Sequence, residues 1–190
     1  MLCQFTVKNY KSIRDEVTFD MQAAAISEHE DRIIKDQDDE MYLPVSAIYG
    51  PNGGGKSNVL TALHTLVAKI LRPLYATEDN EDKVLLQKRI IVEPFAFSDS
   101  KNEPTEFEFD YINDGVKYWY SFSATKQKIV RESLYHAPKG QKAQVFVREG
   151  QKFTFTEDKA RRKLISETVA ENQLFFSVAC TMNDAICINA

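Results

Sequence analysis

The spacing of apolar residues changes along the chain, and each change predicts a different kind of element. Near the N-terminus the apolar runs are short, so residues 2–7 and 17–21 each predict a strand, and residues 44–49 predict a buried strand. After a glycine-rich loop the spacing becomes helical, and residues 56–71 predict a helix that Pro73 closes. The apolar positions of this helix are Val59, Leu60, Leu63, Leu66, Val67, Ile70 and Leu71.

From residue 106 onward every second residue is apolar, which predicts an antiparallel β meander over residues 106–155. Phe107, Phe109 and Tyr111 alternate with carboxylates, and a turn at 113–115 leads into a second alternating run at 116–122. The aromatic alternation favours one buried sheet face over a base-stacking platform. The other predicted strands of this meander are 129–136, 144–147 and 152–155.

The last part of the chain predicts a helix with polar signals at its start. Thr156 is a candidate N-cap, with Glu157 and Asp158 in the first turn, and the helix is expected to reach about residue 172. Residues 174–179 are apolar and predict either a buried strand or the start of another helix.

The loop before the first helix carries the most specific chemistry. Residues 50–57, Gly-Pro-Asn-Gly-Gly-Gly-Lys-Ser, match the Walker A phosphate-binding motif at every position. Glycines allow the backbone to direct its N–H groups inward, and the following helix adds the positive end of its dipole. Lys56 is expected to reach the β- and γ-phosphates, and the Ser57 hydroxyl is expected to bind Mg²⁺. The motif therefore predicts that the protein binds a nucleoside triphosphate.

Composition restricts the class of protein. No apolar run approaches the ~20 residues of a membrane span, and the first residues lack the pattern of a secretory signal. The three cysteines, Cys3, Cys180 and Cys187, are odd in number and lack metal-ligand spacing, so reduced thiols in a cytoplasmic protein are expected. At 190 residues the chain is long enough for one domain, residues 1–190.

The net charge of −4 conceals an uneven distribution. Residues 15–40 are acidic, whereas residues 126–163 are rich in lysine and arginine. Such a basic segment is usually a solvated face, and the alternative is a surface that meets nucleic acid or an acidic partner. Its cations are Lys126, Lys128, Arg131, Lys139, Lys142, Arg148, Lys152, Lys159, Arg161, Arg162 and Lys163.

Two segments resemble the ABC-type ATPase heads of the SMC and RecF-like branch. Residues 50–58 resemble the phosphate loop of these heads, with asparagine before and after the Gly-Gly-Gly-Lys-Ser core, and residues 5–13 resemble their opening strand. The segments 94–97, 114–118 and 132–135 resemble a bacterial and archaeal AAA-type group, which includes phage-defence ATPases similar to the overcoming-lysogenization-defect proteins.

This resemblance implies an α/β P-loop NTPase fold with ATP and Mg²⁺ as ligands. By position in the motifs, Lys11 and Ser12 are expected near the nucleotide, and Ser57 is expected on the metal. The residues expected to enclose the phosphates and Mg²⁺ are Asn52, Gly53, Gly54, Gly55, Lys56, Ser57 and Asn58.

The chain departs from the ABC pattern in several motifs. It contains no Walker B run ending in Asp-Glu, no Leu-Ser-Gly-Gly-like signature and no switch histidine, so no catalytic residue is identified. The place of the metal-sensing glutamine, residues 180–183, has no glutamine. We expect from these departures the N-terminal lobe of a longer ATPase.

Three hypotheses of function follow. The first is an ATPase lobe that binds Mg·ATP, forms a homodimer around it and regulates the effector of a DNA-linked or phage-defence system. The candidate partners are a nuclease or toxin effector and DNA. The second is a small nucleotide-binding regulatory protein without turnover. The third, a GTPase, is disfavoured because the sequence has no Asn-Lys-x-Asp motif.

Overall fold

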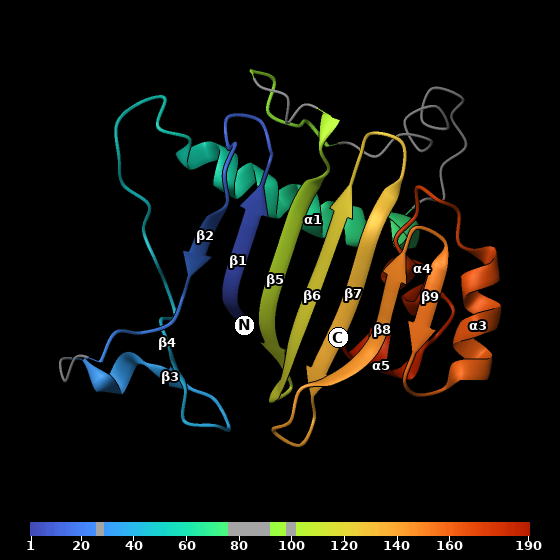
Figure 1. The fold of residues 1–190 in the computed structure, drawn as a ribbon. Coiled ribbons are helices and arrows are strands. Elements are labelled where there is room, and N and C mark those ends of the chain that lie inside the picture. The colour runs from blue at the N-terminus through green and yellow to red at the C-terminus, as the bar shows by residue number, and fades with distance from the viewer. Residues whose placement is uncertain (26–28, 76–91, 98–101) are drawn as a thin grey trace.

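The computed structural model describes residues 1–25, 29–75, 92–97 and 102–190. Within these ranges, seven strands form one antiparallel sheet in the order β2-β1-β5-β6-β7-β8-β9 (Figure 1). These strands are β1 (Leu2–Lys8), β2 (Val17–Asp20), β5 (Thr105–Asn113), β6 (Val116–Ala124), β7 (Ile129–Ala137), β8 (Ala143–Glu149) and β9 (Lys152–Phe155). The predicted strands at 2–7 and 17–21 and the predicted meander are thus confirmed, and β1 joins the first two strands to the meander by pairing with β5.

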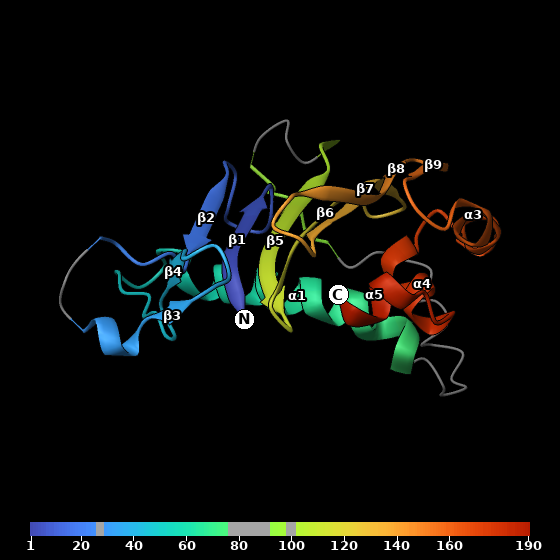
Figure 2. The same ribbon diagram turned by 90° about the horizontal axis from the view of Figure 1, so that it is seen from below.

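The described helices lie along one face and one edge of this sheet. In the view from below, α1, α4 and α5 are all on the same side of the sheet, and α3 lies beside the edge strand β9 (Figure 2). Their bounds are α1 (Lys56–Tyr75), α3 (Lys159–Thr168), α4 (Phe175–Thr181) and α5 (Ala185–Asn189). A short arm beside β2 holds a 3-10 helix (Glu30–Arg32) and a two-stranded ribbon, β3 (Ile34–Lys35) and β4 (Met41–Tyr42).

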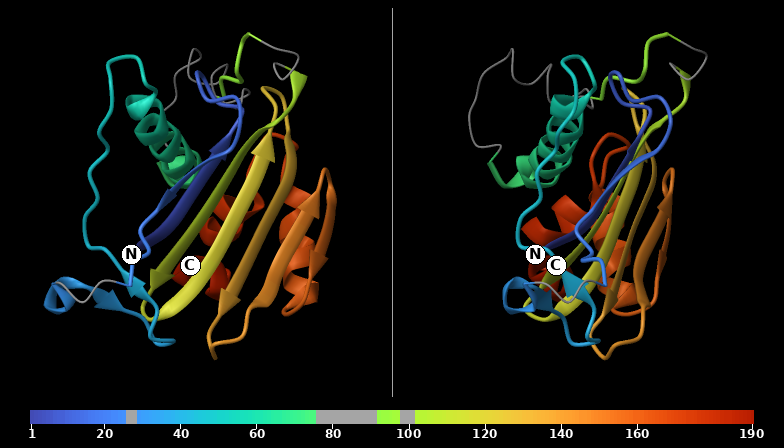
Figure 3. Two further views of the ribbon diagram at one scale, coloured as in Figure 1. Left: turned by 60° about the vertical axis from the view of Figure 1, so that its left-hand side comes forward. Right: turned by 90° about the vertical axis from the view of Figure 1, so that its left-hand side faces the viewer.

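Alternation along the strands separates the two faces of the sheet. Phe5, Phe107, Tyr120 and Phe122 are almost fully buried and point toward the helices, where Leu66 of α1 joins the same core. The intervening positions of these strands are polar or partly exposed and lie on the opposite face, which no described helix covers (Figure 3). The prediction that the aromatic alternation makes one buried face is confirmed.

A buried ion pair joins the sheet to α4. The carboxylate of Glu132, on β7, accepts hydrogen bonds from the backbone N–H groups of Phe175 (2.8 Å) and Phe176 (2.9 Å) at the start of α4. It also accepts from the Tyr120 hydroxyl at 3.0 Å and lies 3.5 Å from the Arg148 guanidinium. Glu132 and Arg148 are both fully buried. Burial raises the pKa of Glu132, and these donors oppose that shift by favouring the ionised form.

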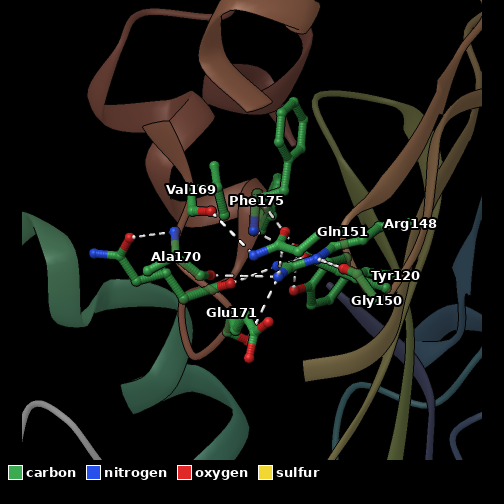
Figure 4. A network of polar contacts seen from close by, with 11 residues as sticks. Tyr120, Arg148, Gly150, Gln151, Val169, Ala170, Glu171 and Phe175 are labelled. Atoms are coloured by element: carbon green, nitrogen blue, oxygen red, sulfur yellow. Dashed lines mark hydrogen bonds and ion pairs between the residues drawn. The ribbon is translucent and has the colours of Figure 1, made fainter. Parts of the chain in front are cut away.

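The guanidinium of Arg148 fixes the segment between α3 and α4 (Figure 4). It donates to the carbonyl oxygens of Ala170 (3.3 Å), Glu171 (3.4 Å) and Gln173 (2.5 Å), and to Gly150 at 2.7 Å. The segment between α3 and α4 forms no helix or strand, so the hydrogen bonds of a regular element do not satisfy its carbonyl oxygens. The Arg148 side chain supplies donors to them.

The predicted strand at residues 44–49 is wrong. The segment forms neither a helix nor a strand, and Val45 and Tyr49 are 77% and 90% exposed. A buried strand needs neighbours on both edges and cover on both faces. Among the described residues, no strand lies beside this segment, so its apolar side chains stay in solvent.

The predicted ends of two helices also need correction. Pro73 does not close α1, which continues to Tyr75, because a proline inside a helix can kink it instead of ending it. Thr156 is not the N-cap of α3, since that helix begins at Lys159 after Asp158 in a left-handed conformation (φ 48°), and it ends at Thr168. Residues 175–181 form a helix, the second of the two alternatives that the sequence left open.

We expect Glu132→Gln to lower the free energy of unfolding by about 3 kcal/mol or more, because the change leaves the buried Arg148 without its counter-charge. The new amide would also direct N–H groups at backbone N–H donors. The matched control is Glu106→Gln, which removes an exposed pair with Lys8 (3.3 Å) and should cost less than about 1 kcal/mol. Urea denaturation of both variants tests this, and equal losses would contradict it.

Candidate functional site

The conformation of the loop before α1 explains its glycines. Gly53 (φ 80°) and Gly55 (φ 81°) adopt left-handed backbone conformations that side chains disfavour. A Cβ atom at Gly54 would lie 3.0 Å from the Pro51 carbonyl oxygen. The loop is therefore wound so tightly that three consecutive positions favour glycine.

Lys56, the first residue of α1, folds back over this loop. Its ammonium group donates to the carbonyl oxygens of Gly50 (2.7 Å) and Pro51 (2.8 Å). The first turn of α1 is anchored in the same loop, because the N–H groups of Asn58 and Val59 donate to the Gly55 carbonyl. A positive charge and the positive end of a helix dipole thus meet at the mouth of the loop, which is the arrangement that binds phosphate groups.

A tight turn between β1 and β2 lies against the loop. Tyr10 and Ile13 exchange two backbone hydrogen bonds of 2.8 Å, and Lys11 between them has a φ of 50°. The Asn58 side-chain amide donates to the Ser12 hydroxyl at 2.6 Å, and the hydroxyls of Tyr10 and Thr65 lie 2.9 Å apart. The turn is therefore held to α1 at two places.

Asn9 connects this turn to the segment that precedes β5. Its side-chain oxygen accepts from the Phe95 N–H at 2.9 Å, and its amide donates to the Glu103 carbonyl at 2.9 Å. The Asn9 carbonyl accepts from the buried Thr105 hydroxyl at 2.8 Å, and the Lys11 N–H donates to the Glu93 carbonyl at 2.6 Å. These bonds bring Phe95 to the turn although it lies 86 positions after Asn9 in the sequence.

The loop, the turn and Phe95 enclose one open pocket of about 610 Å³. Five of the residues predicted for the nucleotide line it, together with apolar and charged side chains that the sequence did not single out. The predicted residues are Ser12, Gly53, Gly54, Gly55 and Lys56, and the others are Ile13, Arg14, Asp15, Val17, Ile48, Tyr49, Val59 and Phe95.

The remaining predicted residues lie near this pocket without lining it. Asn58 reaches it only through its bond to Ser12, and Asn52 and Ser57 are exposed at the loop and the first turn of α1. The Lys11 ammonium lies over the Tyr10 ring, 5.6 Å from its centroid. Among the described residues, no group of three or more His, Cys, Asp or Glu side chains is arranged to hold a metal ion.

Arg14 and Asp15 add charges to the pocket that sequence reasoning missed. The guanidinium of Arg14 donates to the Asp15 carboxylate at 2.9 Å, and this hydrogen bond lowers the pKa of Asp15. Both residues are exposed. Their position directly after Ser12, which the resemblance places near the nucleotide, was the available signal.

The basic segment is not a uniform cationic surface. Arg148 and Arg162 are buried, and Arg162 donates to both carboxylate oxygens of Asp184, at 2.8 and 3.0 Å. Arg161 donates to the carbonyls of Met182 (2.9 Å) and Asn183 (2.8 Å). Two of the three cations at 161–163 therefore hold α3 to the α4–α5 connection, and only Lys163 in that group is left as a simple surface charge.

Residues 180–183, the expected place of a metal-sensing side chain, lie at the end of α4. The Asn183 N–H donates to the Cys180 carbonyl at 3.0 Å, and Asn183 has a left-handed φ of 58°. Neither Thr181 nor Asn183 lines the pocket of the phosphate loop. No described helix is both long and apolar enough to cross a bilayer.

Comparison with protein families places this site in a known context. A family model described as "AAA domain, putative AbiEii toxin, Type IV TA system" matches residues 45–178, which include the phosphate loop, α1 and most of the sheet. The chain belongs to this AAA domain family. Family membership identifies a P-loop domain of the nucleotide-binding ATPase type, which usually binds Mg²⁺ with the nucleotide. No curated protein matches the chain.

We expect the Ser12–Asn58 hydrogen bond to couple the turn to α1 in this AAA domain. Ser12→Ala and Asn58→Ala should each lower the free energy of unfolding, and the double variant should lose less than the sum, with a coupling energy of about 1 kcal/mol. Thr61→Ala is the control, since its hydroxyl bonds only within α1, to the Ser57 carbonyl. Additive losses for Ser12 and Asn58 would contradict this geometry.

Proposed function

We propose that this AAA domain is the Mg·ATP-binding lobe of an ABC/SMC-like ATPase, and that it acts as the ATP-driven switch of a DNA-linked or phage-defence system. The observation that carries the proposal is the pocket in which the Walker A loop, the Ser12 turn and Lys56 meet. Its glycine conformations and its lysine have the chemistry that a triphosphate requires.

In this proposal Lys56 exchanges partners when ATP binds. Its ammonium group leaves the carbonyl oxygens of Gly50 and Pro51 and binds phosphate oxygens, which carry far more negative charge. The Ser57 hydroxyl would supply the protein's ligand to Mg²⁺, which commonly keeps water and phosphate oxygens as its other ligands. The backbone N–H groups of Gly53, Gly55, Lys56 and Ser57 would complete the phosphate cradle, since those of Gly54 and Asn58 donate to the Pro51 and Gly55 carbonyls. The Asn52 side chain lies beside them, and Asn58 would act through its bond to Ser12.

The nucleoside end of ATP lies, in our proposal, against the outer part of the pocket. Val17, Tyr49 and Phe95 line this part and offer apolar and aromatic surface to a purine. Arg14 lies beside Ser12, and its guanidinium is available to a phosphate or ribose oxygen once it leaves Asp15. Lys11, which lies over Tyr10, remains at the edge of the site.

The face of α1 that points away from the sheet supports the assignment as one lobe of a larger core. Leu60 (58% exposed), Val67 and Leu71 form an apolar stripe along it, and Val45 and Tyr49 are exposed before the loop. Exposed apolar side chains that recur along one helix face, here with His64 between Leu60 and Val67, are a candidate surface for a covering partner. We propose that a second half of the ATPase core covers this stripe, and that two such heads enclose ATP as a homodimer.

The partners proposed for this switch are a nuclease or toxin effector and, less directly, DNA. For DNA, the exposed cations Lys126, Lys128, Lys139, Lys152, Lys159 and Lys163 remain available, whereas Arg148 and Arg162 do not. A DNA contact would thus use lysines on several elements and would weaken steeply with salt.

An alternative function is a nucleotide-binding regulatory protein without turnover. It is favoured by one observation: among the described residues that line the pocket, Asp15 is the one carboxylate, and it is paired with Arg14. A general base for water needs an available acceptor within hydrogen-bond reach of the attacking molecule.

Mg·ATP binding and steady-state hydrolysis of the chain test these readings together. We expect Lys56→Ala to weaken ATP affinity by roughly 10- to 100-fold, because charged contacts to the phosphates are lost, while the thermal unfolding temperature changes little. The matched control is Lys152→Ala, which removes an exposed lysine at the start of β9 and should leave binding unchanged.

Each outcome of this experiment has a definite meaning. Unchanged ATP affinity in Lys56→Ala would overturn the assignment of the pocket. Binding without turnover in the parent supports a lobe or regulatory protein that lacks a base, and robust turnover that Lys56→Ala abolishes would show that a base lies within this chain.

A further inference from the structure

A second concave site lies on the sheet face opposite the helices. It has a volume of about 320 Å³ and is built on the middle strands β5, β6 and β7. Two rows of side chains cross these strands in register. Asp110, Trp119 and Tyr135 form the first row, and Glu108, Ser121 and Ser133 form the second. We call this site the outer groove.

The outer groove already holds a cation from its own chain. The ammonium of Lys142, which lies just before β8, is 4.5 Å from the centroid of the Trp119 ring and 5.1 Å from that of Tyr135. The ammonium of Lys117, two residues before Trp119 on β6, lies 5.6 Å from the Trp119 centroid. Lys117 also forms an ion pair with Glu40. Aromatic faces attract cations, so the two rings form a cation-binding cage.

The carboxylates of the groove do not pair directly with this lysine. Among the described residues neither Glu108 nor Asp110 forms an ion pair, since Lys142 lies over the rings and beyond salt-bridge distance. Asp110 is half-buried, and burial raises its pKa to about 6. Glu108 and Asp110 against Lys142 leave an excess of negative charge beside two aromatic faces.

We propose that the outer groove is a docking site for an arginine side chain of a partner protein, which displaces Lys142 from the rings of Trp119 and Tyr135. A guanidinium fits better than an ammonium, because its planar group stacks on an aromatic ring and its N–H fork pairs with a carboxylate at the same time. Glu108 and Asp110 supply that carboxylate. Lys142 is exposed on the loop after Gly140 (φ 75°) and leaves without disturbing a strand.

The charges of the groove favour this occupant over a nucleic acid. A nucleobase could stack on Trp119, but its phosphates would then approach Glu108 and Asp110 on the next strand. Repulsion between these phosphates and the two carboxylates opposes binding. The site is separate from the phosphate loop, so its test needs no nucleotide and does not depend on the proposed ATP function.

Trp119 is the one tryptophan of the sequence, so its fluorescence reports on this groove directly. The probe is the capped peptide acetyl-Gly-Arg-Gly-Arg-Gly-amide, with its glutamine counterpart as the control. We expect a saturable fluorescence change with the arginine peptide only. Asp110→Asn and Glu108→Gln should each weaken binding roughly fivefold, and Glu149→Gln, an exposed carboxylate at the end of β8, should not.

The variant Lys142→Gln tests whether Lys142 is an occupant that the arginine displaces or a residue that the groove needs for its structure. Because it vacates the rings and removes a competing charge, it should strengthen arginine-peptide binding by about threefold. Weaker binding in this variant, no saturable change in the parent, equal responses to both peptides, or tighter binding of an oligothymidylate than of the arginine peptide would each overturn the proposal.

Asp110 also has a signature in stability. Its carboxyl faces Glu108 on its own strand, Asp20 on β2, Lys117 on β6 and Lys142. The pKa of Asp110 is raised in the folded protein, so ionising this carboxyl lowers the free energy of unfolding. The loss is complete above about pH 6 and absent below the ordinary pKa of 3.8. We expect Asp110→Asn to raise the thermal unfolding temperature at pH 8 and to lose this advantage at pH 4. A variant that is less stable at pH 8 would show that Asp110 serves the fold and not a ligand.

Discussion

The buried carboxylate of Glu132 is the contact on which the arrangement of helices against the sheet depends. It lies in the middle of β7, where a charge is costly, and it is retained because four donors converge on it. Two of these donors are the first backbone N–H groups of α4, so Glu132 performs the work of an N-cap from a different element. Arg148 completes the arrangement by binding the carbonyls of the preceding segment.

This contact extends to the phosphate loop through packing. Ser177 of α4 donates to the Ile70 carbonyl of α1 at 2.6 Å, and Phe175 and Phe176 pack among the sheet aromatics Phe146 and Tyr120. The helix that begins at Lys56 is therefore fixed toward its far end by α4. Against the β1–β2 turn it is fixed at its first turn by Asn58 and near its middle by Thr65. The loop is thus positioned by contacts at both ends of the helix that follows it.

Sequence patterns predicted the local elements well and the long-range contacts poorly. The period-two alternation and the Asp114-Gly115 turn were sufficient for the meander, because register in a hairpin follows from its turn and its buried face. The Walker A motif likewise singled out Gly53, Gly54, Gly55 and Lys56, which line one pocket, because neighbours in a short loop stay close in the fold. The prediction for 44–49 failed because an apolar run states only that cover is needed, and not that cover is present.

The missed features share one physical cause. Arg148 and Arg162 look in sequence like any other cations of a basic segment, and only the buried carboxylates of Glu132 and Asp184 reveal their role. Phe95 enters the pocket through Asn9, a connection between residues far apart in the chain. A charge count along a sequence therefore predicts surface potential only after the buried pairs are removed from it.

Strand β5 is shared by the two proposed sites, and its alternation explains how. At its first residue, Thr105 bonds to the turn that carries Ser12, and a few residues later Glu108 and Asp110 point to the outer face. Phe107, which lies between Thr105 and Glu108, packs into the core against Tyr10 of the same turn, with ring centroids 5.8 Å apart. A strand buried on one face and polar on the other thus supports a nucleotide pocket at its start and a charged groove along its length, without either site using the other's side chains.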